Sequence, residues 1–291
     1  MKHVQTQPIS VLDQLTEVAQ KQQQSLDVLV SSYAQERLLV RLAASSYEDQ
    51  YLLYGDYVVG VLAKDRLKSA ARLTLCAKRM ANKDSIIQHA FKEICGIKIP
   101  EDDINFDGNE IEISANDEKV HLRIPFQLGS ITTYIEIVIQ LIDKLPMTRK
   151  MIVVPTFSSS STTELFMYPI ELIIANKFNT IYQYPAVEQS LKDYYDIYLL
   201  ATTQNFEGRV LQEVIFDNFD RQKTTIEKYP AVFSKQLSLD ASKLKVWQQL
   251  TDQPFDRVQK LVQQLLCPIY AELVVECEFF KNWDYKLCDW R

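Results

Sequence analysis

LYGDYVVGVLAKDRLKSAARLTL, residues 53–75, is the stretch that decides how the first part of the chain is built. A short apolar run reaches Gly55, residues 57–66 suit a helix, and a second apolar run at 70–76 suits a strand. Asp56 stands at the expected N-cap of that helix, where a carboxylate accepts a hydrogen bond from a free backbone amide. This order is typical of the front of an enzyme active site, yet the second run carries no acidic residue.

The composition is that of a globular protein with a sizeable core. The chain has 291 residues, of which 47% are apolar, and its 15 Tyr and 13 Phe supply large side chains for burial. Only 6 Gly are present, and neither GxGxxG nor GxxxxGKS/T occurs, so a glycine-rich phosphate loop is not expected. The net charge of −6 means that contact with nucleic acid requires a local basic patch.

Cysteine and histidine usage indicates a reducing compartment. The 5 cysteines are widely spaced without a CxxC pair, and only 3 His are present, so we expect free thiols and no zinc site. The N-terminus lacks the apolar core of a signal peptide, and no apolar run reaches the length of a membrane span. We therefore expect a soluble, cytoplasmic protein without membrane contact.

A group of basic residues begins near the end of the helix predicted after Gly55, and only Asp65 and Asp84 dilute it. Its members are Lys64, Arg66, Lys68, Arg72, Lys78, Arg79 and Lys83. A solvated helix face and a phosphate-contacting surface both fit this pattern, and the sequence leaves the two interpretations open.

Hydrophobic periodicity divides the chain into two parts. Residues 10–46 are predicted to be helical, with the polar QKQQQ as a turn or an exposed face, and residues 97–156 alternate like antiparallel strands. A Ser/Thr-rich loop is predicted at 158–163, and apolar stripes of helical spacing follow it. We therefore predict an α+β domain over residues 1–157 and a helical domain over residues 158–291.

The stretch YPIELIIANKFNTIY, residues 168–182, places a lysine on an apolar helix face. Lys177 lies four residues after Ile173, and a buried ammonium without a partner is costly. The next predicted helix, QSLKDYYDIYLL, offers Asp193 and Asp196 one turn apart as partners. Because lysine binds phosphate as a point charge, Lys177 is a candidate phosphate contact that Asp193 or Asp196 would orient.

Two structural interpretations compete with that functional one. Ser190 and Asp193 match a capping box, in which the acid bonds back to the N-cap amide. Asp196 could instead pair with Lys192 across one helical turn.

The C-terminal CEFFKNWDYKLCDWR also allows two interpretations, because its aromatic residues suit either the protein's own core or a partner. We expect them to pack on the protein's own core.

Taken together, several motifs resemble the AbiEii/AbiGii toxin family. YPIELIIANKF and LKDYYDIYLL are similar to its YPxExxxAEKF element and the K-D-x-Y-D run that follows. SSYAQERLLVRLAASSYEDQYLLYGD, residues 31–56, is similar to the family's lead-in to a strand and a Gly-containing turn. NFDRQKT, residues 218–224, is similar to TFxxRxT. The order and spacing of these matches, from about residue 28 to residue 224, agree with the family pattern.

The resemblance implies a fold and a biochemical setting. The fold would be a nucleotidyltransferase-like mixed sheet with flanking helices, followed by a C-terminal helical domain. Members of the family act as bacterial toxins in type IV toxin–antitoxin and abortive-infection systems, so a cognate antitoxin is an expected partner. They use a nucleoside triphosphate and a divalent metal such as Mg²⁺, and some of them transfer nucleotides onto tRNA.

Carried over by position, the resemblance also assigns residues. Lys177, Asp193 and Glu136 would be catalytic, Glu136 being the counterpart of the family's third carboxylate. The nucleotide would be bound by Gly55, Asp56, Arg72, Lys177 and Asp196.

The sequence departs from the family at the metal-binding strand. A gapless alignment from Leu53 places Arg72 and Thr74 where the family has the two aspartates of a D-x-D motif, and Asn176 replaces a glutamate. Paired carboxylates hold Mg²⁺, whereas an arginine cannot ligate a metal and one remaining carboxylate makes a poor site. Residues 101–103, EDD, precede a predicted strand, so we expect them to form a surface turn.

Three hypotheses remain open. The first is an active nucleotidyltransferase with an unusual metal arrangement. The second is a pseudoenzyme that binds a nucleotide, RNA or a partner protein through the inherited cleft. The third is a purely structural interaction protein. The substitutions at Arg72 and Thr74 favour the second hypothesis for the mechanism, while the motifs favour membership of the toxin family.

Overall fold

The computed structural model describes residues 10–64, 72–99, 102–146, 149–154, 156–157, 162–185, 187–233 and 239–291. The chain divides into two compact units. The first unit comprises residues 1–61 and 65–168, and the second comprises residues 62–64 and 169–291. Arg66 and Lys68 of the basic group, and Ser158 to Ser161 of the predicted loop, lie outside the described residues.

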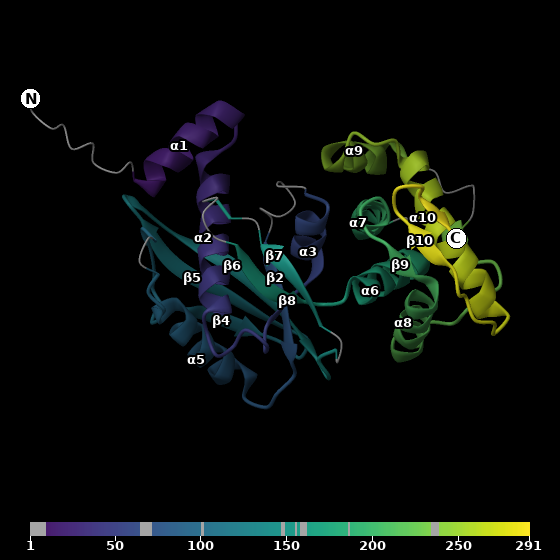
Figure 1. Ribbon diagram of the computed structural model, residues 1–291, viewed down its shortest axis with the longest axis horizontal. Helices are drawn as coiled ribbons and strands as arrows, with labels where there is room; N and C mark the ends of the chain where they lie inside the picture. Colours follow the sequence, from purple (N-terminus) through teal and green to yellow (C-terminus); the bar gives the residue numbers. More distant parts are fainter. Residues whose placement is uncertain are drawn as a thin grey trace, which may run out of the picture. The chain divides into compact units, whose positions relative to one another are not determined.

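The first unit begins with helices and continues mainly as strands (Figure 1). Its helices are α1 (Val11–Gln22), α2 (Leu26–Ala43), α3 (Gly55–Leu62) and α5 (Lys83–Gly96), the last residue of α3 being counted with the second unit. Its strands are β1 (Leu52–Leu53), β2 (Leu73–Lys78), β3 (Ile104–Phe106), β4 (Glu112–Ala115), β5 (Lys119–Leu128), β6 (Ile131–Ile142), β7 (Lys150–Val154) and β8 (Thr163–Met167). The predicted turn between the first two helices is confirmed at Gln23, which has a left-handed backbone.

These strands form one mixed sheet. Within the described residues its order is β3-β5-β6-β2-β1-β8-β7, with β4 also paired to β5. β2 runs parallel to β6 and β1 parallel to β8, whereas the other pairs are antiparallel. The predicted α+β class and mixed sheet are therefore confirmed. The expectation of helix alone after residue 158 is wrong for residues 163–167, which form β8 between β1 and β7.

One face of the sheet is buried and the other is largely open. The alternation along β5 and β6 directs Leu122, Ile124, Ile137 and Ile139 into the core. α2 lies against β6 and β8 and contacts α5 (Figure 1). Glu136 points to the open face, as its alternation with the buried isoleucines predicts.

A buried ionic cluster joins α2 to the start of β3. The Asp102 carboxylate is fully buried; it accepts a hydrogen bond from Nε of Arg37 at 3.3 Å and another from Arg41. Arg41 also donates to the Ile104 carbonyl at 3.3 Å. The expected surface turn at residues 101–103 is therefore wrong for Asp102, because two arginines compensate its charge inside the unit. Glu36 also belongs to this cluster, and burial raises the pKa of its carboxyl group. The Phe157 amide donates a hydrogen bond to that carboxylate at 2.5 Å, which opposes part of the rise in pKa.

The second unit is a helical assembly with a small sheet (Figure 1). Its helices are α6 (Ile170–Gln183), α7 (Glu188–Ala201), α8 (Gly208–Arg221), η1 (Ala231–Phe233), α9 (Ala241–Leu250) and α10 (Phe255–Val274). Its strands are β9 (Phe206–Glu207), β10 (Asn282–Asp284) and β11 (Asp289–Trp290), which pair in the order β11-β10-β9. α6 packs against α7 and α8, and α10 packs against the same two helices.

The aromatic C-terminal tail folds back on the second unit. Trp283 is 1% exposed and its indole N–H donates to the Ala201 carbonyl at 2.8 Å. The indole N–H of Trp290 donates to the Leu265 carbonyl at 3.0 Å. The expectation that the tail packs on the protein's own core is confirmed. Each buried indole finds an acceptor, so its burial leaves no unpaired donor.

All five cysteines are free thiols, as predicted from their spacing. In the part of the chain that the structure describes, no helix combines the length and the apolar character that crossing a membrane requires.

A glycine allows a close backbone approach in the second unit. Gly208 starts α8, and its amide donates to the Lys281 carbonyl at 2.8 Å. A Cβ at this position would lie 2.5 Å from the same carbonyl oxygen and against the Phe279 ring. Only glycine therefore allows α8 to start directly against the C-terminal segment.

Gly208→Ala is expected to lower the free energy of unfolding by about 1–3 kcal/mol, because the added methyl group overpacks this contact. Gly96→Ala is the matched control, since nothing lies within 4 Å of its Cβ and its backbone is not left-handed. Urea unfolding followed by circular dichroism compares the two variants. Equal midpoints for both would contradict the tight approach at Gly208.

Candidate functional site

The first unit has a tight turn beside β2, the strand on which the family pattern places metal ligands. Gly55 has a φ of +65°, which favours glycine, and a Cβ there would lie 3.7 Å from the Thr74 side chain. The Tyr54 amide donates to the Thr74 carbonyl at 2.9 Å, which ties the turn to β2. The structure thus brings together two sequence-predicted positions, Gly55 and Thr74.

Asp56 lies in the first turn of α3, because the helix already begins at Gly55. The predicted N-cap role of Asp56 is therefore wrong. A carboxylate in a first helical turn still interacts favourably with the positive end of the helix dipole.

Arg72 and Glu136 form an ion pair on the open face of the sheet. Nη2 of Arg72 lies 3.3 Å from Oε2 of Glu136, and the two side chains are 56% and 49% exposed. The parallel register pairs Leu73 with Ile137, which sets their preceding residues side by side. Because the pair is exposed, it contributes about 1 kcal/mol or less to stability.

A second arginine stands opposite Glu136 in the sheet. Arg123 is its register partner on β5, but the Arg123 guanidinium is directed elsewhere. It stacks on the Tyr134 ring at 3.4 Å from the centroid and lies 3.3 Å from Glu112. Of the two arginines, only Arg72 pairs with Glu136.

These side chains do not fit a divalent metal. Mg²⁺ takes hard oxygen ligands, usually with at least one or two carboxylates, and Arg72 offers none. Thr74 supplies a hydroxyl and Glu136 a single carboxylate that is already paired. Over the described residues, no group of three or more His, Cys, Asp or Glu side chains is arranged to hold a metal ion.

The second unit holds a buried cation between two carboxylates. Nζ of Lys177 on α6 lies 2.9 Å from Oδ1 of Asp193 and 2.7 Å from Oδ2 of Asp196, both on α7. The three residues are 8%, 3% and 0% exposed. The prediction that Lys177 finds its partners in Asp193 and Asp196 is confirmed. Two carboxylates around one ammonium leave this buried group with a formal charge of −1.

The capping-box interpretation of Asp193 is wrong. α7 begins at Glu188 after an N-cap at Val187, so Ser190 already lies within the helix. The Ser190 hydroxyl donates to the Tyr184 carbonyl instead of capping α7. Asp193 is therefore oriented toward α6, where it accepts from the Lys177 ammonium.

A polar network extends along α6 next to Lys177. Nδ2 of Asn218 on α8 donates to Oδ1 of Asn176, and Asn179 donates to Oδ1 of Asn218 at 3.1 Å. Asn179 also donates to the Thr224 hydroxyl at 3.0 Å, which in turn lies within reach of Gln183 at 2.7 Å. Sequence reasoning missed this network, although Asn218 and Thr224 are the two ends of the quoted NFDRQKT motif.

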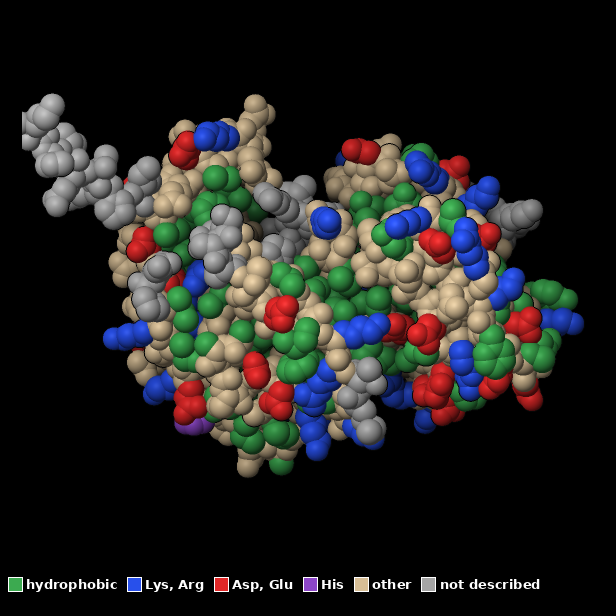
Figure 2. Space-filling view, in the orientation of Figure 1, with side chains coloured by type: hydrophobic (Ala, Val, Ile, Leu, Met, Phe, Trp, Pro, Cys, Tyr) green, Lys and Arg blue, Asp and Glu red, His purple; other side chains and the backbone are tan. Residues whose placement is uncertain are grey.

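The described members of the basic group lie on different elements. Arg79 pairs with Asp143 at 2.9 Å, and Lys83 at the start of α5 lies 3.8 Å from Asp117. Lys78 ends β2 and is exposed. They do not form a single helix face, which was one of the two interpretations. On the face shown in Figure 2, Lys and Arg side chains are interspersed with Asp and Glu.

Comparison with known proteins identifies the family. The family model described as "Nucleotidyl transferase AbiEii toxin, Type IV TA system" matches residues 81–264. This range is more than half of the 291 residues, and the chain therefore belongs to that family. The match includes Glu136, Lys177, Asp193 and Asp196. It begins after the turn at Gly55 and the divergent Arg72 and Thr74.

Two solved structures from Helicobacter pylori are similar to this chain. JHP933 is 15% identical, covers 87% of this chain and 95% of its own length, and has a TM-score of 0.46. A presumed nucleotidyltransferase is 14% identical, covers 88% of this chain and 100% of its own, and has a TM-score of 0.45. No curated protein sequence matches the chain.

Lys177→Ala is expected to lower the free energy of unfolding by about 3–5 kcal/mol, because it leaves two buried carboxylates without their cation. Arg209→Ala is the control in the same unit, since Arg209 pairs with Glu213 and Glu278 at the surface. That control should cost about 1 kcal/mol or less. Thermal and urea unfolding give the free energy of unfolding of both variants. Equal losses of stability would show that the buried Lys177 ion pairs contribute no more than the exposed Arg209 ion pairs.

Proposed function

We propose that this chain binds the phosphates of a nucleoside triphosphate and that its metal-dependent nucleotidyl transfer is weak or lost. The observation that carries the proposal is the Arg72–Glu136 ion pair, at 3.3 Å, in the place of a carboxylate pair. A guanidinium binds phosphate oxygens directly through two N–H donors, but it does not lower the pKa of an attacking hydroxyl as a metal ion does. Nucleotide binding would thus be retained, while nucleotidyl transfer would be weak or lost.

The exposure of this ion pair supports a ligand-binding role. Arg72 and Glu136 are both about half exposed, so breaking their contact costs little. A phosphate group with more than one negative oxygen is a stronger partner for Arg72 than one carboxylate. The Gly55 turn and Asp56 stand beside the same strand, and we include both among the proposed nucleotide contacts.

The proposed roles in the second unit follow the family pattern. Lys177 would contact the nucleotide, and Asp193 and Asp196 would hold its ammonium in position. In an active form of the protein, Lys177, Asp193 and Glu136 would be the catalytic residues.

A second candidate function is active nucleotidyl transfer with an unusual metal arrangement. The observation that favours it is the intact Lys177, Asp193 and Asp196 group within the family match. In that case Mg²⁺ and a nucleoside triphosphate would be required, with RNA such as tRNA as the acceptor. In either case we propose a cytoplasmic bacterial protein with a cognate antitoxin as partner, in a toxin–antitoxin or abortive-infection setting.

A transfer assay tests the proposal. The purified chain is mixed with total tRNA and each labelled nucleoside triphosphate in turn, with Mg²⁺ or Mn²⁺. We expect nucleotide binding in a parallel equilibrium assay and no label on the RNA. Label that appears with the parent chain and is lost in Glu136→Gln, which removes only an exposed charge, would establish the active alternative. The absence of both label and nucleotide binding would overturn the proposal and favour a structural interaction protein.

A double variant that introduces the two aspartates of the family pattern tests metal binding directly. Together, Arg72→Asp and Thr74→Asp place two carboxylates beside Glu136, and we expect Mn²⁺ affinity to rise by about tenfold or more. Titration calorimetry or the Mn²⁺ electron paramagnetic resonance signal measures this gain. Lys78→Asp, at the far end of β2, is the control because it adds a carboxylate away from Glu136. An unchanged Mn²⁺ affinity in the double variant would mean that these positions do not form the metal-binding strand.

A further inference from the structure

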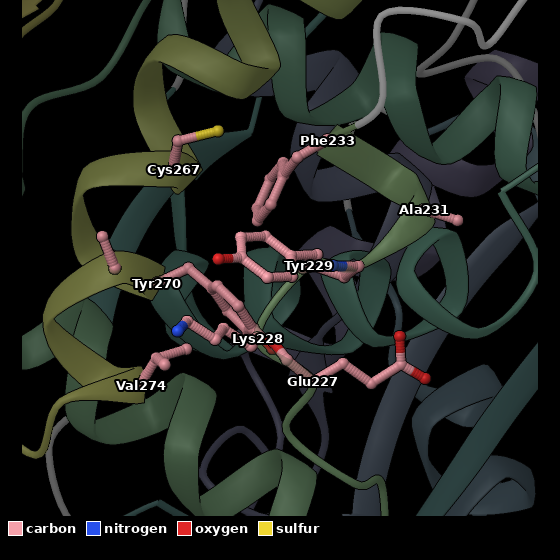
Figure 3. A pocket seen from close by; sticks show the side chains of 10 residues that line it. Glu227, Lys228, Tyr229, Ala231, Phe233, Cys267, Tyr270 and Val274 are labelled. Atoms are coloured by element: carbon pink, nitrogen blue, oxygen red, sulfur yellow. The ribbon is translucent and has the colours of Figure 1, made fainter.

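A cavity of about 840 Å³ lies in the second unit beside helix α10. One wall comes from residues 227–233, which include η1, and the other from Cys267, Tyr270, Ala271 and Val274 of α10 (Figure 3). The volume falls in the range of small-molecule sites. None of the residues proposed above for nucleotide binding or catalysis lines it, so it is a separate feature of the fold.

The floor of the cavity is aromatic and fixed in place. The Phe233 ring packs on the Tyr270 ring at 5.4 Å between centroids and on Phe178 of α6 at 5.9 Å. The Tyr270 hydroxyl lies 2.8 Å from that of Tyr182 and donates to the Glu227 carbonyl at 2.6 Å. Because the Tyr270 hydroxyl already has these hydrogen-bond partners, Tyr270 contributes mainly its apolar ring to the cavity. A preformed floor of this kind lowers the ordering cost of binding.

The wall formed by residues 227–233 also carries an uncovered aromatic ring. Tyr229 is 83% exposed, the highest value among the large hydrophobic side chains of the described residues. The buried Pro230 follows it and anchors the segment. A planar ligand against Tyr229 and the floor would cover apolar ring surface, and stacked aromatic rings are stabilising beyond the area that they bury.

A cation is available at one end of the cavity. The Lys228 ammonium lies 5.4 Å from the centroid of the Tyr229 ring, and no described residue forms an ion pair with it. Figure 3 shows the Lys228 amine and the Glu227 carboxylate pointing to opposite sides. The two charges therefore do not cancel locally, and the Lys228 end favours an anionic group.

The sulfur in this cavity acts as an apolar surface. Cys267 is half-buried, and burial raises the pKa of its thiol to about 11. A thiol that stays protonated at neutral pH is a weak nucleophile, so the site is suited to reversible binding.

We propose that this cavity binds a planar aromatic small molecule with one anionic group. The aromatic part stacks against the rings of Tyr229, Phe233 and Tyr270 that line the cavity, and the anionic group contacts Lys228. The proposal does not depend on the nucleotide-binding role of the other residues.

Two dyes with the same aromatic skeleton test the proposal on the folded, full-length chain. The probes are 1-anilinonaphthalene-8-sulfonate, which is anionic, and N-phenyl-1-naphthylamine, which lacks the sulfonate. We expect saturable fluorescence enhancement with one site for each dye. Lys228→Ala should weaken the sulfonate dye about tenfold, as expected for one charge-assisted contact, and leave the neutral dye unchanged.

A cavity-filling variant locates the binding. Ala271 is exposed on α10, so Ala271→Trp fills the cavity without entering the core, and it should abolish enhancement of both dyes. Phe280→Ala is the control, because Phe280 is 71% exposed and does not line the cavity. Circular dichroism confirms that each variant is folded. Absence of dye binding, or binding that survives Ala271→Trp, would overturn the proposal.

Discussion

The second unit depends on the compensation of one buried ammonium. Lys177 is carried on the same helix as the aromatic core residue Phe178, so folding necessarily takes its charge out of water. The pair of carboxylates on α7 compensates this charge, and the two ion pairs join α6 to α7. The amide network through Asn179 and Asn218 then holds α8 to another side of α6. Polar contacts therefore specify the arrangement, while apolar burial stabilises it.

The first unit contains both a buried ionic group and an exposed ion pair. Its buried ionic group, around Asp102, lies at the start of β3, whereas Arg72 and Glu136 stay half exposed on the open sheet face. A buried pair is rigid and costly to separate, and an exposed pair exchanges readily with a ligand. The chain thus has a buried ionic group in each unit and an exposed pair in the first. In the function proposed above, Arg72 gives this exposed pair a preference for an anionic ligand over a cation.

Sequence reasoning found the features that local periodicity encodes. The helical stripe around Lys177 and the alternation around Glu136 both predicted side-chain direction, and the cost of burying an ammonium predicted its partners. It missed features that depend on distant contacts. β8 is short and follows a polar stretch, so only its pairing with β1 and β7 makes it a strand. Asp102 looked like a surface acid because the two arginines that bury it lie some 60 residues earlier. Ser190 matched a capping motif, yet the helix begins two residues before it.

The position of β1 in the sheet has a consequence for synthesis of the chain. Leu53 pairs with Leu75 on one side and with Met167 on the other. The second neighbour leaves the ribosome long after the first, and closing so long a loop is entropically unfavourable. Until then β1 has an open edge, and the Gly55 turn that follows it lacks its final support. β8 ends at Met167, and Lys177 of α6 meets its two carboxylate partners only when Asp196 of α7 has been made. A nascent chain therefore lacks both the second neighbour of β1 and the Lys177 group until more than half of it has been made.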